Sequence, residues 1–219
     1  MLAENFFLCI AAPLCVALLF VREGARRFCS FFLTGLAMCL LSAYVGGFLV
    51  SAASCSVDDA AVYLTPISEE LMKMAPLLFY YLVFEPEDKR LLSAAAAVGA
   101  GFATFENCYY LFSVGSTALE YALIRGLAVG IMHVVCTMST PMVLILFRGV
   151  KHMTGILMAG MMTVAITYHG LYNLLVSESG ISRTVGYALP LCTVAGILIL
   201  TRVRKALLAR LRKRKTIAY

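Results

Sequence analysis

Two adjacent glutamates and a nearby lysine, Glu69, Glu70 and Lys73, lie inside an apolar stretch that is long enough to cross a bilayer. An ionisable residue at that depth costs about 2.5–3.5 kcal/mol on insertion scales, so it indicates a functional site. On a helix, residues three or four positions apart share a face, so Lys73 can neutralise either glutamate but not both. One carboxylate is left uncompensated, as expected of a residue that takes up and releases protons. A buried ion pair that only fixes helix packing is the alternative.

The three apolar segments that follow carry polar residues of the same kind. The sequence GFATFEN contains Glu106 and Asn107, and the next segment contains His133. The sequence YHGLYN contains His169 and Asn173. Carboxylates, imidazoles and amides can together activate a water molecule, move protons and stabilise an oxyanion.

The composition places these residues in a membrane protein. The chain has 219 residues, of which 62% are hydrophobic and 14% charged, and its mean hydropathy is +0.90. A soluble protein is usually about 45–50% apolar and about 25% charged. We therefore expect an all-α, polytopic helix bundle. Its net charge of +6 reflects where the basic residues lie along the chain, and we expect no nucleic-acid partner.

Seven apolar segments are long enough to cross a bilayer as helices. They cover residues 5–21, 29–53, 61–84, 91–113, 125–147, 153–176 and 184–200. We expect one transmembrane domain over residues 1–201, with a catalytic core of about 62–176, followed by a basic tail over 202–219. The run SAAAAVGAG in the fourth segment predicts close helix packing. The pair Gly126 and Gly130 in the fifth segment predicts the same.

Basic residues give the expected orientation of these segments. Lysines and arginines gather in alternate loops, and eight of the 18 follow the last segment. The positive-inside rule therefore places the N-terminus outside and the C-terminus in the cytoplasm. The basic tail is expected to lie on anionic lipids, where each basic residue near the surface contributes about 1 kcal/mol.

Counting residues along these segments predicts a single polar site. From the outer ends of their segments, Glu69, Glu106, His133 and His169 each lie seven or eight residues deep. At 1.5 Å per residue, all four lie about 11–12 Å below the outer surface. Four antiparallel helices would therefore bring two acids and two imidazoles to one level in the outer half of the membrane.

Four short motifs on consecutive segments resemble the signatures of the PrsW family of intramembrane proteases. In chain order they are EELMK (69–73), GFATFEN (101–107), Arg125 with His133, and HGLYN (169–173). This family is related to the CAAX-prenyl-protease-like (CPBP) family and, more remotely, to the scaffold subunit of gamma-secretase. The resemblance implies a protease of a prokaryotic cytoplasmic membrane. It also implies that the protease cleaves single-span, membrane-tethered regulators, such as anti-sigma factors, near the outer face.

Two mechanisms are open for such a protease. In the metal-free scheme, Glu69 or Glu70 is the general base and Lys73 balances the charge of the pair. His133 and His169 orient the water or protonate the leaving amine. The sequence favours this scheme, because it contains no H-E-x-x-H or other local spacing of metal ligands.

The supporting residues of the metal-free scheme are expected to be amides and a second acid. Asn173 or Asn107 would donate to the oxyanion, and Arg125 would support the site. Glu106 would set the tautomer of a histidine or serve as a second acid.

The competing scheme is a metal site. Glu106, His133 and His169 would hold a catalytic Zn²⁺, and a remaining glutamate would be the base. The residue types suit zinc, since two histidines and a carboxylate are the ligands of many catalytic zinc sites.

Two non-proteolytic functions are alternatives. A proton-coupled transporter also places acids and histidines within helices, but it more often has two matching halves, and the sequence has no such repeat. A non-catalytic scaffold or pseudoprotease could use the polar cluster for packing alone. The doubled acid argues against the scaffold, because packing needs only one carboxylate for Lys73.

Overall fold

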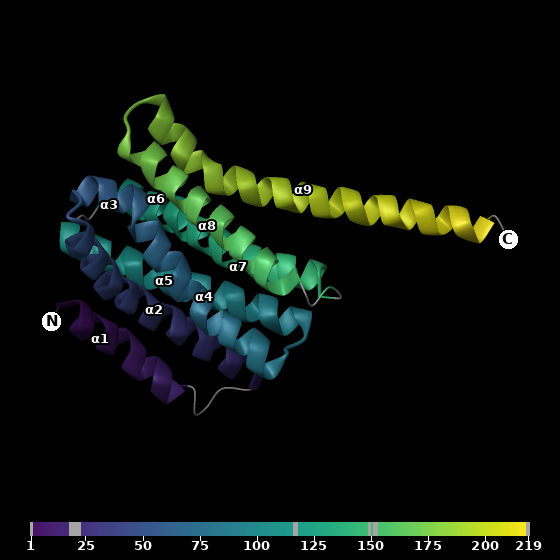
Figure 1. Ribbon diagram of the computed structural model, residues 1–219, viewed down its shortest axis with the longest axis horizontal. Helices are drawn as coiled ribbons and strands as arrows, with labels where there is room; N and C mark the ends of the chain where they lie inside the picture. The colour runs from purple at the N-terminus through teal and green to yellow at the C-terminus, as the bar shows by residue number, and fades with distance from the viewer. Residues whose placement is uncertain (1, 18–22, 116–117, 149, 151–152, 218–219) are drawn as a thin grey trace.

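The computed structural model describes residues 2–17, 23–115, 118–148, 150 and 153–217, which form a helical bundle without a strand among them (Figure 1). The helices are α1 (Leu2–Ala17), α2 (Glu23–Ala53), α3 (Val57–Tyr63), α4 (Thr65–Phe84), α5 (Asp88–Val114), α6 (Leu119–Ile124), the π-helical turn η1 (Arg125–Val129), α7 (Gly130–Leu146), α8 (Thr154–Ser177) and α9 (Ile181–Ile217). The all-α prediction is confirmed for the described residues.

Within the described ranges, four helical stretches are long and apolar enough to cross a membrane. They are Glu23–Ala53, Leu119–Leu146, Thr154–Ser177 and Ile181–Arg204. The chain is therefore a multi-pass membrane protein. The helix α4 has 20 residues, which is sufficient length for a crossing, but it carries the three charged residues Glu69, Glu70 and Lys73.

Small residues let α5 pack closely against its neighbours. A Cβ on Gly101 would collide with the carbonyl oxygen of Phe32 on α2, and a Cβ on Gly35 of α2 would collide with the carbonyl oxygen of Val98 on α5. A Cβ on Gly99 would lie 3.0 Å from a backbone atom of α7. The close packing predicted from SAAAAVGAG is confirmed, and α5 is the interior helix that carries Glu106 into the bundle.

The third predicted segment is divided into two helices. Leu64 separates α3 from α4, and Pro66 lies in the first turn of α4. Proline is tolerated there because the first N–H groups of a helix have no partner within the helix. A Cβ on Gly170 would lie 2.8 Å from the carbonyl oxygen of Val62, so the missing side chain lets α8 approach α3. The segment before the Glu-Glu pair is thus a separate short helix.

The fifth predicted segment is also irregular. It consists of α6, the π-helical turn η1 and α7, and the predicted close contact at Gly126 and Gly130 is wrong for Gly126. A Cβ on Gly126 would meet nothing within 4 Å, and one on Gly130 would make only ordinary contact at 3.5 Å. The π-helical turn begins at Arg125, one residue before Gly126, so the backbone is irregular where the packing motif is expected.

The last helix, α9, continues from the seventh predicted segment to Ile217 without a break in the backbone. In Figure 1 its C-terminal part extends beyond the bundle, away from the end where α3 and α6 lie. The expected contact of the basic tail with anionic lipids concerns the side chains of 205–219, which lie outside the described part of the chain.

Candidate active site

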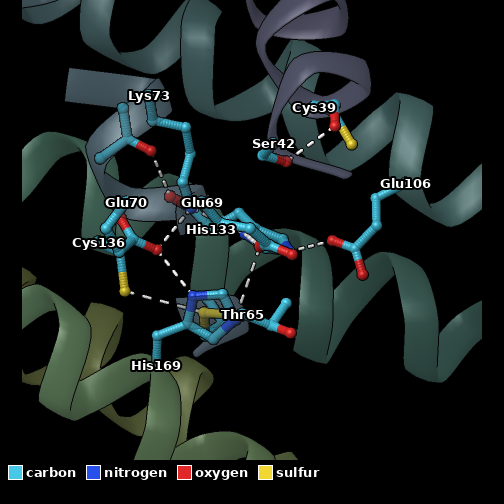
Figure 2. Close-up of polar contacts among 12 residues, drawn as sticks. Cys39, Ser42, Thr65, Glu69, Glu70, Lys73, Glu106, His133, Cys136 and His169 are labelled. Atoms are coloured by element: carbon cyan, nitrogen blue, oxygen red, sulfur yellow. Dashed lines mark hydrogen bonds and ion pairs between the residues drawn. The ribbon is translucent and has the colours of Figure 1, made fainter. Parts of the chain in front are cut away.

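Four helices bring the predicted acids and imidazoles into one site (Figure 2). His133 Nδ1 of α7 lies 3.9 Å from Glu69 Oε2 of α4, and His169 Nε2 of α8 lies 3.8 Å from the same oxygen. His133 Nε2 is in contact with Glu106 Oε2 of α5. The four residues that share a depth in the sequence therefore meet in space.

The structure distinguishes the two adjacent glutamates. Lys73 Nζ donates to Glu70 Oε1 at 2.6 Å, and His169 Nδ1 lies 2.8 Å from that oxygen. The side chains of Glu70 and Lys73 are only 2% and 1% exposed. Glu70 is therefore the compensated acid, and Glu69 is the acid that Lys73 leaves uncompensated.

Glu69 is the acid of the pair that lines a cavity. It is 9% exposed, and its Oε2 atom is buried without a hydrogen-bond partner among the described residues. It lines a cavity of about 660 Å³, together with Glu106, His133 and His169. A distance of 3.8–3.9 Å to each imidazole is too long for a direct hydrogen bond, and it leaves room for one bridging atom.

A π-helical turn places Arg125 against Glu106. The guanidinium of Arg125 donates to Glu106 Oε1 at 2.8 Å. The carbonyl oxygen of Arg125 accepts from the Gly130 N–H and also from Asn107 Nδ2 at 2.9 Å. The side chain of Asn107 thus holds the turn through one amide hydrogen. Asn107 is not among the described residues that line the cavity. Such π-helical turns are frequent at functional sites.

We expect Asn107→Leu to lower the free energy of unfolding by about 0.5–1.5 kcal/mol, because one hydrogen bond to the π-helical turn is lost. Peptide cleavage should slow as well, because Arg125 is no longer held against Glu106. Thermal unfolding and initial cleavage rates of purified protein measure the two effects. Thr163→Val is the control, since it removes an exposed hydroxyl on α8 and should change neither quantity. Equal behaviour of the two variants would contradict this role of Asn107.

Asn173 connects α8 to α3. Its Nδ2 donates to the carbonyl oxygen of Ala61 at 2.8 Å, and the residue also lines the cavity. Two further donors line the cavity, and both are buried without partners among the described residues: Arg125 Nε and the hydroxyl of Tyr172. The sequence reasoning did not select Tyr172, although it lies within the quoted YHGLYN motif, immediately before Asn173.

The residues fit a metal ion. Glu69, His133 and His169 each offer a ligand atom, and these atoms lie within 4.8 Å of one another. Zinc ligands at 2.0–2.2 Å from the ion lie roughly 3–4 Å apart, so small movements would suffice. The ring nitrogen of each histidine that does not face Glu69 contacts an acid, Glu70 for His169 and Glu106 for His133. A carboxylate behind each histidine is the usual second layer of a metal site.

This ligand set differs from the predicted set of Glu106, His133 and His169. Glu69 faces both imidazoles, whereas Glu106 is held by Arg125 and by the Nε2 atom of His133. The structure therefore favours Glu69 as the carboxylate ligand, with Glu106 behind His133.

Hydrolysis within a membrane requires a cavity lined by groups that accept and donate protons, and this bundle provides one. The fold and the site therefore define an intramembrane hydrolase. The model of the PrsW family intramembrane metalloprotease matches residues 15–201. The chain belongs to this family and is an intramembrane peptidase. No significant match to a curated protein or to a solved structure was found.

Proposed function

We propose that the protein hydrolyses a peptide bond of a single-span, membrane-tethered substrate near the outer face of a prokaryotic cytoplasmic membrane. Regulators such as anti-sigma factors are the substrate class that the family implies. The observation that carries the proposal is the buried, unpartnered Oε2 atom of Glu69, which lies 3.8–3.9 Å from both imidazoles at a cavity wall.

The proposed topology has seven crossings, with the N-terminus outside and the C-terminus in the cytoplasm. Arg148, after α7, supports it, because this residue contacts Asp88 at 3.2 Å and the Pro86 carbonyl oxygen at 2.7 Å. The basic end of α7 and the turn between α4 and α5 therefore share one side of the bundle, as the distribution of basic residues predicts. The catalytic cavity includes residues of α3 and α6, which lie at the other end (Figure 1).

We propose that Glu69, His133 and His169 hold a divalent metal ion, with zinc as the first ion to test. Zinc in such a site acidifies a water molecule and polarises a peptide carbonyl. Glu70 and Glu106 orient the two imidazoles from behind. Lys73 Nζ lies 3.0 Å from His133 Nδ1, so coordination through that nitrogen requires the ammonium to move toward Glu70.

The remaining side chains of the cavity handle protons and negative charge. Where Glu69 is a metal ligand, the Glu106 carboxylate stays bound to Arg125 and His133, so it holds His133 in place and does not take up the proton. In the metal-free scheme, Glu69 Oε2 accepts it directly. Arg125 Nε and the Tyr172 hydroxyl can donate to the oxyanion, because neither has a partner among the described residues. Asn173 keeps a second amide hydrogen for the same purpose.

The function is tested by comparing membrane-protein N-termini in cells that lack this chain and re-express either the wild type or Glu69→Gln. We expect the wild type to generate new N-termini within the outer half of single-span proteins, and the variant to generate none. Mass spectrometry of the membrane fraction identifies these termini. Identical sets of N-termini in the two strains would overturn the proposal.

The metal is tested on purified protein by elemental analysis. We expect about one zinc ion per chain in the wild type and almost none in His169→Ala, because two protein ligands cannot retain the ion well. Stringent chelation should abolish cleavage, and added zinc should restore it. Cleavage that continues unchanged after chelation would remove the metal from the mechanism and leave Glu69 as the base.

A further inference from the structure

The helix α2 lines the catalytic cavity mainly with small residues, and Leu40 and Val50 are its two larger ones. Cys39, Ser42 and Gly46 form a buried row along the cavity wall, and Figure 2 shows Cys39 and Ser42 near the active-site residues. Ala43 and Gly47 form a second row on the same wall, and both are exposed. The two rows follow the helical spacing of three and four residues, so they make one continuous face.

The aromatic side chains that line the same cavity all come from other helices. These include Phe105, Tyr109, Tyr110, Tyr121, Tyr172 and Tyr187. The volume of about 660 Å³ is within the range of roughly 300–1,000 Å³ that is typical of pockets for small ligands. The cavity can therefore hold a few residues of a peptide, and the space for their side chains lies on the α2 side.

The unpartnered carboxylate of Glu69 indicates that the cavity binds a ligand. Glu69 lines the same cavity as the small residues of α2, and its Oε2 atom is buried and unpartnered among the described residues. The face of α2 lies beside that acid, because a Cβ on Gly46 would lie 3.2 Å from Ser68 Oγ, and Ser68 precedes Glu69 in the chain. The small residues of this face therefore leave room for a side chain near the reacting bond.

We propose that the face formed by Ala43 and Gly47 determines the substrate specificity of the protease by accepting one large apolar or aromatic side chain beside the scissile bond. This inference rests on the proposed proteolytic function. The apolar character of the partner follows from the lining, which consists mainly of aromatic and aliphatic residues. In a membrane-spanning substrate, such a side chain is present at most positions.

Gly47 allows a test that leaves the fold intact. A Cβ at Gly47 would meet nothing within 4 Å, so a larger side chain begins in free space there. A Cβ at Gly46 would lie 3.2 Å from Ser68 Oγ, so that position is already packed against α4 and is less suitable. Leucine also favours the helix more than glycine does, so a loss of folding is not expected.

The experiment compares Gly47→Leu and Ala43→Leu with Gly160→Leu. Gly160 is the matched control, because it is an exposed glycine within α8 with nothing within 4 Å of its Cβ, and it does not line the cavity. The reporters are single-span peptides in liposomes that carry a sequence cleaved by the wild type in cells. In a series of variants, each of the three residues on either side of the cleaved bond is replaced in turn by alanine.

We expect Gly47→Leu and Ala43→Leu to cleave the parent reporter at least tenfold more slowly than the wild type does. The two variants should cleave one of the alanine-substituted reporters at nearly the wild-type rate. The residue replaced in that reporter is the one whose side chain occupies the α2 face. Gly160→Leu should cleave every reporter as the wild type does. Circular dichroism checks that all variants keep their helix content.

Two outcomes would overturn the inference alone: α2 variants that cleave every reporter at the wild-type rate, or α2 variants that lose activity equally on all reporters. A wild-type protein that cleaves none of the reporters would instead overturn the proposed function. The two failures are therefore distinguishable, because only the second affects the wild type.

Discussion

Glu69→Gln is expected to slow peptide cleavage by about 10²–10⁴-fold, the range for loss of a general acid or base. The effect should be chemical, because the Oε2 atom of Glu69 has no hydrogen-bond partner among the described residues, so the substitution breaks no hydrogen bond of that atom. In metal-free protein, replacing an unpartnered buried acid with a neutral amide should leave the melting temperature unchanged or raise it. Initial cleavage rates and thermal unfolding of the same preparation measure both quantities.

Glu70→Gln is the matched control, because it changes the neighbouring residue in the same way. Glu70 accepts from Lys73 at 2.6 Å and lies 2.8 Å from His169, so this variant should lose stability as well as activity. The pair of variants separates a chemical role from a structural one. Cleavage that persists when both glutamates are replaced would eliminate the catalytic interpretation.

The level of the active site could be predicted from the sequence because a helix rises by a constant 1.5 Å per residue. Glu69, Glu106, His133 and His169 were placed at one depth by counting from the ends of apolar segments, and the structure brings them into contact. The prediction needed no knowledge of which helices are neighbours. The irregular turns before Glu69 and before His133 leave the relevant parts of α4 and α7 intact.

The partners of each side chain could not be predicted in the same way. The choice between Glu69 and Glu70 depends on His169, which is 99 positions away from Glu70 in the chain. Local spacing allows Lys73 to bind either acid, and only the packing of α8 against α4 decides between them. The same limit explains the carboxylate of the proposed metal site, because counting depth cannot show that Arg125 and the Nε2 atom of His133 hold Glu106.

Local backbone irregularities were the other feature that sequence patterns did not reveal. The π-helical turn at Arg125–Val129 is stabilised by the side chain of Asn107 from another helix, so its cause is not local in sequence. Gly126 and Gly130 have the spacing of a packing motif, yet neither lies in close contact with another helix. The break at Leu64 has a local signal, Pro66, which can equally lie within the first turn of an uninterrupted span.

Lys73→Met is expected to lower the free energy of unfolding by about 3–5 kcal/mol, because it leaves Glu70 buried without its cation. For a chain of this size, that corresponds to a fall in melting temperature of about 6–20 °C. Arg148→Met is the control, since it removes the cation of an ion pair with Asp88 whose side chains are 40% and 52% exposed. The control should cost less than about 1 kcal/mol. Thermal unfolding of detergent-solubilised protein measures both changes.

Replacing both partners identifies the cause of that loss. Glu70→Leu combined with Lys73→Leu removes the buried charges together, and such replacements are often neutral or stabilising. The double variant should therefore recover most of the stability lost in Lys73→Met. The double variant should be inactive, because the Nδ1 atom of His169 no longer contacts the carboxylate of Glu70. If the double variant unfolds at the same temperature as Lys73→Met, the lysine acts through its contact with His133 and not by compensating Glu70, and the assignment of Glu69 as the free acid loses its basis.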